Sequence, residues 1–195
     1  MNTPPAIIEE ARDFPFTGQI WYKIGDAEEF TYLGKNIITN DASIFVARLV
    51  ADPTEPTAGA FALAVGTGDT GWDKQSVPAA VATQGSLYAE IDRKQFSAID
   101  FIDSLGATSA IPTNILDFTV TFSTSEAVGA LVEMGIVCAP VDIVAPLVAT
   151  PIPQGSWNDP TVDRRNYDTF LNARNFNVIN KPGTMTLTFV WRVTF

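Results

Sequence analysis

The chain has 195 residues, of which 46% are hydrophobic and 17% charged, and its formal net charge at pH 7 is −10. This length suits one domain with a sizeable core, and the acidic excess disfavours nucleic acid or an anionic membrane as a partner, because both bind Lys/Arg surfaces. Histidine is absent and Cys138 is the single cysteine. These two facts exclude an internal disulfide framework, a cysteine-based zinc site and a histidine general base. We therefore expect no enzyme, cofactor or metal site.

Residues 1–17 are expected to form an N-terminal arm ahead of a single domain at 18–195. The arm contains Pro4-Pro5 and has neither a basic start nor a long apolar stretch, so it does not resemble a signal peptide. A tail of this kind is ordered only when something ties it down. The apolar side chains expected to bury it against a neighbouring subunit are Ile7, Ile8, Phe14 and Phe16.

The next segments predict a hairpin and one helix. GQIWYKI (18–24) and EFTYL (29–33) are rich in β-formers and flank the turn-like GDAE. Asp41 is placed to cap a helix over residues 42–51, which Pro53 would end. The residues at helical spacing are Ile44, Phe45, Arg48 and Leu49. No later segment predicts a helix of this quality, so strand and loop are expected for the rest of the chain.

Two segments alternate apolar and polar residues at the period of a β-strand. The stripes expected to face a core are Leu116/Phe118/Val120/Phe122 and Leu187/Phe189/Trp191/Val193, and Met185 and Phe195 continue the second alternation at its two ends. The second segment spans about 36 Å at ~3.3 Å per residue, the full height of a sandwich. Weaker strands are expected at residues 59–66, 87–101, 130–138 and 168–178. The predicted fold is all-β, an antiparallel, jelly-roll-like β-sandwich with one short helix and an N-terminal arm.

Residues 140–165 are rich in proline and predict a long irregular loop. Loops of this length in a compact domain are usually functional, and Trp157 is its candidate interface residue. Cys138 precedes the loop in the apolar run GIVCAP. We expect it to be a buried structural thiol rather than a nucleophile.

The stretch FALAVGTGDTGWD (61–73) carries Gly66, Gly68 and Gly71 in the G-x-G-x-x-G spacing of a dinucleotide-binding loop. That mechanism needs a helix beginning inside the motif, so that its N-terminus holds the phosphates. No helical period follows here, and the chain lacks the strand–helix alternation of a Rossmann unit. The glycines are instead expected to let the backbone turn tightly with positive φ.

Charged and aromatic residues raise two further possibilities, a calcium site and a sugar-binding surface. Asp159, Asp163 and Asp168 could supply oxygens to calcium, but two arginines lie among them and the spacing matches no EF-hand loop, which favours solvated loop charges. Trp72 and Trp157 could stack on sugar rings, although aromatic residues in β-proteins mostly pack.

Glu133 and Arg174 fall on strands that are expected to be largely buried, where a charge is tolerated only when it is paired. We therefore predict that Glu133 and Glu90 find partners among Arg93, Arg174 and Arg192.

Five segments follow one another over residues 35–195. They are KNIITNDASIFVARLVA, FALAVGTGDTG, SLYAEIDRKQF, VEMGIVCAP and FLNARNFNVINKPGTMTLTFVWRVTF. Leu87, Glu90 and Arg93 form an L-x-x-E-x-x-R element, and Arg174, Phe176 and Lys181 belong to the last segment. The series resembles small β-rich virion proteins of tailed bacteriophages. The inserted WDKQSVPAAVATQ and the long loop are departures from the pattern.

The resemblance implies a non-enzymatic structural protein of the virion, assembled in the host cytoplasm. The role it indicates first is a capsid cement or decoration subunit that bridges neighbouring shell subunits. Its partners would be copies of itself, for instance in a trimer, and the major capsid protein or neck and tail proteins. A neck, baseplate or tail-fibre adaptor is the first alternative, and a carbohydrate-binding β-sandwich module is the second.

Overall fold

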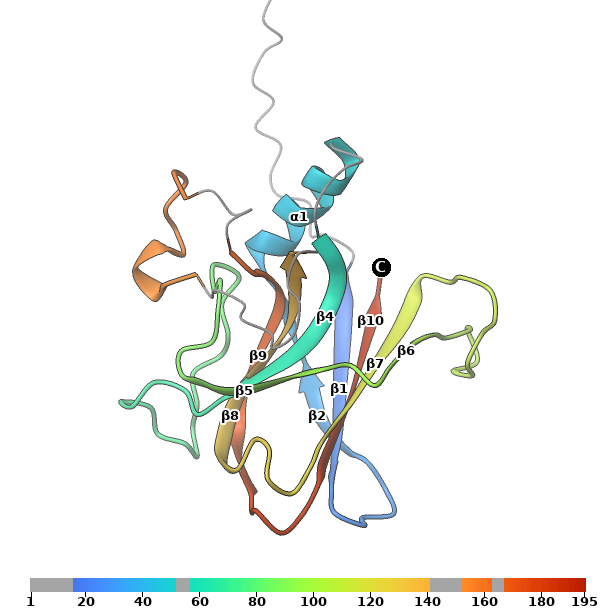
Figure 1. Cartoon of the computed structure of the whole chain (residues 1–195), viewed down its shortest axis with the longest axis vertical. Helices are drawn as coiled ribbons and strands as arrows, with labels where there is room; N and C mark the ends of the chain where they lie inside the picture. Colours follow the sequence, from blue (N-terminus) through green and yellow to red (C-terminus); the bar gives the residue numbers. More distant parts are fainter. Residues whose placement is uncertain (1–15, 52–56, 141–151, 163–166) are drawn as a thin grey trace, which may run out of the picture.

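The computed structural model describes residues 16–51, 57–140, 152–162 and 167–195, which form the predicted antiparallel β-sandwich (Figure 1). The predicted hairpin is present as the first two strands. Strands are also found within each weaker segment, but the one predicted over residues 87–101 is divided into two strands of different sheets, at 90–95 and 98–101. The elements are β1 (Thr17–Ile24), β2 (Thr31–Lys35), β3 (Ile37–Ile38), α1 (Asn40–Ala51), β4 (Thr57–Gly66), β5 (Glu90–Gln95), β6 (Ala98–Phe101), β7 (Ile115–Phe122), β8 (Gly129–Pro140), the 3-10 turn η1 (Gln154–Ser156), β9 (Thr169–Lys181) and β10 (Leu187–Thr194).

Two five-stranded sheets make up the sandwich. The first sheet has the order β2-β1-β10-β7-β6 and the second has the order β3-β9-β8-β4-β5. The last two strands lie inside the sheets, because β10 pairs with β1 and β7 while β9 pairs with β3 and β8. In each sheet, a strand from the first part of the described chain therefore pairs with one of the last two strands, which gives a jelly-roll-like arrangement.

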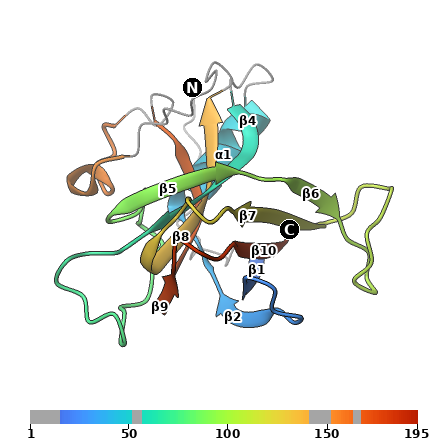
Figure 2. The same ribbon diagram turned by 60° about the horizontal axis from the view of Figure 1, so that its bottom comes forward.

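The chain passes directly from one sheet to the other at both edges of the sandwich. Asn36 joins β2 to β3, and its N–H donates to the carbonyl of Gly18 at 3.3 Å. On the opposite edge β5 leads into β6, where the N–H of Ser97 donates to the carbonyl of Thr119 at 2.8 Å. Figure 2 shows β5 and β6 following one another across this edge. Each crossing thus stays hydrogen-bonded to the first sheet.

The two alternating stripes form the core between the sheets, as predicted. Register places Trp191 opposite Phe118 and Phe189 opposite Val120, and all four side chains are buried. The strand is shorter than the eleven residues predicted, and Met185 and Phe195 at the ends of the alternation are 48% and 45% exposed. Both lie outside β10, so the opposite sheet does not cover them.

Helix α1 packs against β9 through its inner face, where Ala42 and Phe45 are buried. Its cap is Thr39, whose hydroxyl accepts the N–H of Ala42 at 3.4 Å and donates to the carbonyl of Phe170. The prediction that Asp41 caps the helix is therefore wrong, since Asp41 lies in the first turn and is buried. The predicted stop at Pro53 lies outside the described residues.

Candidate functional site

The glycine-rich turn encloses a carboxylate of the protein itself. Glu133 of β8 is fully buried, and its Oε1 accepts the N–H groups of Gly68 at 3.0 Å and Ala89 at 2.8 Å. Its Oε2 accepts the N–H of Tyr88 at 2.9 Å. Of the three glycines of the motif, Gly68 has the predicted positive φ, at 70°, whereas Gly66 and Gly71 do not. A Cβ on Gly66 would lie 2.4 Å from Oε1, so only glycine allows this approach.

This arrangement contradicts the predicted ion pair of Glu133 and gives the G-x-G-x-x-G segment a role other than nucleotide binding. The expected arginine partner of Glu133 is wrong, because backbone N–H groups satisfy the carboxylate instead. Burial raises the pKa of Glu133, although the three N–H donors oppose that shift. No helix begins in the turn, and its Gly68 N–H binds the carboxyl group of Glu133 rather than a nucleotide phosphate.

The predicted pair between Glu90 and Arg93 is present. The guanidinium binds both oxygens of Glu90, at 2.5 Å from Nε and 2.8 Å from Nη2, and its Nη1 lies 2.8 Å from Oδ2 of Asp168. Asp168 is 3% exposed, and burial raises the pKa of its carboxyl against the effect of Arg93. Burial lowers the pKa of Arg93, but its two carboxylate partners raise it above the ordinary value overall. The cluster ties β5 to the chain just before β9.

The other two arginines differ in their partners. Arg192 of β10 makes a bidentate pair with Asp117 of β7, with both N–O distances at 2.7 Å. Arg174 donates from Nη2 to the carbonyl of Leu33 at 3.2 Å. No carboxylate pairs with Arg174 in the described part of the chain, so the prediction of an ion pair there is wrong for those residues. Arg174 instead links β9 to β2 across the two sheets.

Trp157 and Trp72, distant in the sequence, both pack against Tyr88. The ring centroids are 4.6 Å apart for Trp72 and Tyr88 and 5.1 Å apart for Tyr88 and Trp157, both edge-on. The indole N–H of Trp157 donates to the carbonyl of Ile152 at 3.0 Å and to Ser86 Oγ at 3.2 Å. The predicted interface residue is therefore half-buried and anchors the loop around η1 to its own domain.

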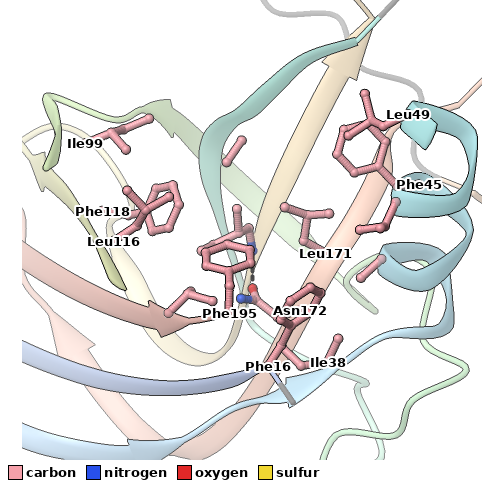
Figure 3. A pocket seen from close by; sticks show the side chains of 15 residues that line it. Phe16, Ile38, Phe45, Leu49, Ile99, Leu116, Phe118, Leu171, Asn172 and Phe195 are labelled. Atoms are coloured by element: carbon pink, nitrogen blue, oxygen red, sulfur yellow. Dashed lines mark hydrogen bonds between the residues drawn. The ribbon is translucent and has the colours of Figure 1, made fainter. Parts of the chain in front are cut away.

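An apolar pocket of about 340 Å³ opens between the sheets beside α1 (Figure 3). Phe45 and Leu49 of α1 face it from one side, while Ile99 of β6 and Leu116 of β7 face it from the other. Its one polar lining residue is Asn172, whose Oδ1 accepts the N–H of Ile136 at 3.1 Å. That bond leaves the cavity surface overwhelmingly apolar.

The rim of this pocket is exposed to solvent. Leu49 and Ile99 are each 46% exposed, and Phe195 is 45% exposed. Phe16 packs edge-on against Phe195, with centroids 4.8 Å apart at 69°. Phe16 thus packs on its own domain, and its expected contact with a neighbouring subunit stays a prediction. Ile7, Ile8 and Phe14 lie outside the described residues.

The pocket is the feature that sequence reasoning missed. Its one signal was the helical spacing of Phe45 and Leu49 in α1, both of which line the pocket. The remaining lining comes from strands that are far apart in the sequence, and only the folded chain brings them together.

In the described part of the chain, the aspartates considered as calcium ligands do not gather into a metal site, and Cys138 does not form a reactive-thiol site. Asp159 accepts the N–H of Thr161 at 2.8 Å, Asp168 binds Arg93, and Asp163 lies outside the described residues. Within the described ranges no cluster of three or more acidic or cysteine side chains could hold a metal ion. Cys138 is buried as predicted, and burial raises its pKa. None of the helices in those ranges is long and apolar enough to cross a membrane.

Comparison of the chain with models of protein families and with curated proteins finds no match. The fold and the pocket define it as an antiparallel β-sandwich protein with an apolar hollow open at one end.

Proposed function

We propose that the protein is a non-enzymatic structural subunit of a bacteriophage virion, bound to the capsid as a cement or decoration protein. The observation that carries the proposal is the apolar pocket with its exposed rim of Leu49, Ile99 and Phe195. Contiguous exposed apolar surface marks sites of association with other proteins. The ordered series of motifs that resembles phage virion proteins supports the same role.

The ionised groups described above support an architectural role. Glu133, Arg93 and Arg192 each bind groups of the same chain. Catalytic carboxylates need an accessible cleft and a substrate position within hydrogen-bond reach. The pocket offers neither a carboxylate nor a cation among its lining residues.

Quantitative mass spectrometry of purified particles tests the proposal. A cement protein occurs in numbers comparable with those of the major shell protein, whereas a neck, baseplate or tail-fibre adaptor occurs in far fewer copies. Absence from purified particles would contradict both roles. Particles carrying Leu49→Asp should lose the subunit, and those carrying Leu105→Asp should retain it, because Leu105 is 92% exposed and lies outside the pocket.

One observation favours a carbohydrate-binding module as a second candidate. Trp72, Tyr88 and Trp157 form a half-exposed aromatic cluster on one side of the domain, and aromatic rings are a common platform for sugars. The indole N–H of Trp157 is already engaged by the fold, so Trp72 would be the ring available for stacking. A glycan-binding screen with wild type and Trp72→Ala decides it: binding that is lost in the variant supports this candidate, and no binding removes it.

A further inference from the structure

We infer that the apolar pocket beside α1 receives the N-terminal arm of a second copy of the chain, with Ile7 and Ile8 as the inserted side chains. This inference rests on the proposed structural role and names the contact through which copies would associate. It starts from the pocket, whose volume of about 340 Å³ lies within the range of preformed binding sites, roughly 300–1,000 Å³.

The chemistry of the pocket selects an aliphatic occupant. Its lining is apolar apart from Asn172, whose side-chain oxygen is already taken by the N–H of Ile136. A charged or strongly polar ligand would lose its hydration there with only the side-chain amide N–H groups of Asn172 as polar partners among the lining side chains. Aliphatic side chains lose nothing on entry and gain contacts with Phe45, Phe118 and Leu171.

The chain itself supplies such side chains next to the pocket. Residues 1–15 lie outside the described structure and end where Phe16 lines the pocket wall. The adjacent pair Ile7 and Ile8 is the aliphatic centre of that segment. From Phe16, the eight to nine residues back to Ile8 and Ile7 can extend over roughly 26–32 Å, which is enough to reach an adjoining sandwich.

Two features favour a neighbour over the same chain. Pro15 favours an extended conformation for Phe14, which does not support an immediate reversal into the adjoining pocket. In addition, Val50 at the end of α1 is 83% exposed and lies outside the pocket lining. An arm of the same chain filling the pocket would leave Val50 uncovered, whereas a second domain arriving with its arm can cover the pocket and Val50 together.

The test uses two complementary variants of the full-length chain. The arm variant carries Ile7→Asp and Ile8→Asp and keeps an intact pocket. The pocket variant carries Leu49→Asp and Ile99→Asp and keeps an intact arm; both pocket positions are nearly half-exposed, so the substitutions are compatible with folding. Leu105→Asp is the matched control, a substitution of the same kind at an exposed site away from the pocket. Circular dichroism and thermal melting establish that each variant is folded, and Ile99→Asp alone replaces the pocket variant if the double substitution unfolds it.

Light scattering coupled to size exclusion, over a range of concentrations, measures association. We expect wild type and Leu105→Asp to associate, and each double variant to associate at least about 10- to 100-fold more weakly, as expected for loss of one buried aliphatic side chain. An equimolar mixture of the two variants should form a one-to-one complex, because one supplies the arm and the other supplies the pocket. This rescue would not occur if each arm bound its own domain.

Three outcomes would overturn the inference: wild type that stays monomeric, association that survives the pocket substitutions, or a mixture that remains monomeric. The proposed function fails separately, because it is decided by the presence of the protein in particles. Purified copies that exchange arms while particles lack the protein would leave the inference standing and remove the virion role.

Discussion

Replacing Trp191 with alanine measures how strongly the first sheet depends on its inner face. Trp191 is fully buried at the centre of β10, opposite Phe118 of β7 and Ile20 of β1. Its indole N–H lies 3.4 Å from Oδ1 of Asn36, a long contact that adds little. The loss therefore comes almost entirely from packing.

Removal of a buried aromatic ring costs about 3–5 kcal/mol, which combines lost transfer free energy with the cavity left behind. For a chain of this length, each 1 kcal/mol lowers the melting temperature by about 2–4 °C. Trp191→Ala should therefore melt about 6–20 °C below wild type while remaining folded in the cold, since total stabilities are about 5–15 kcal/mol.

Trp21→Ala is the matched control, since it removes the same ring from the adjacent strand β1 but on the outer face of the sheet. Trp21 is half-buried and contacts Tyr32 at 5.6 Å and the Arg192 guanidinium at 5.8 Å. Contacts of these two kinds contribute about 1–2 kcal/mol together. Urea unfolding of both variants, with the m-value checked for two-state behaviour, gives the two free energies. Equal losses for Trp21→Ala and Trp191→Ala would refute the assignment of inner and outer faces.

Three further predictions concern the outer face of the second sheet. Burial raises the pKa of Glu133, so its contribution to the free energy of unfolding increases as the pH falls from neutrality towards 4.5. Glu133→Gln should flatten this increase when urea unfolding is measured across that pH window. An unchanged dependence of the unfolding free energy on pH would count against the raised pKa. Gly68→Ala should cost about 2 kcal/mol or more, from the positive φ and from a Cβ only 2.5 Å from the Trp72 ring, with an altered tryptophan emission; a neutral effect would contradict the geometry of the turn. Arg93→Leu should cost about 3–5 kcal/mol at pH 7 by leaving a buried carboxylate unpaired, and acidification that protonates Asp168 should recover part of the loss; a loss that does not change with pH would point to packing instead.

The strands could be predicted wherever one face of the sheet is buried and the other is not. Phe118 and Trp191 alternate with polar neighbours because the pleat sends successive side chains to opposite faces. The same alternation predicts a strand that also includes Met185 and Phe195, whereas β10 runs from Leu187 to Thr194, because periodicity does not show where strand pairing stops. Thr39 was missed as the cap because Asp41 is an equally good cap by residue type, and only the packing of the helix on β9 decides between them.

The partners of charged residues could be predicted when the two side chains are close in the sequence. Glu90 and Arg93 sit on one short strand, so their pairing is a local property. Glu133 shows the opposite case, because its donors are backbone N–H groups, which every residue carries and no sequence pattern marks. The pocket beside α1 was missed for a related reason, as its walls come from both sheets and the helix.

The crossings of the chain between the two sheets affect how readily copies of this protein aggregate when they are concentrated. An open sheet edge presents a row of unpaired backbone groups, and such an edge recruits strands from any neighbouring chain. Here the edge strands turn through Asn36 and Ser97 into the opposite sheet, which shortens each edge and bends it away from a straight template. Growth by indiscriminate edge-to-edge pairing is thereby suppressed at the high local concentration of a crowded surface. Contacts between copies are then left to side chains, which can be made specific.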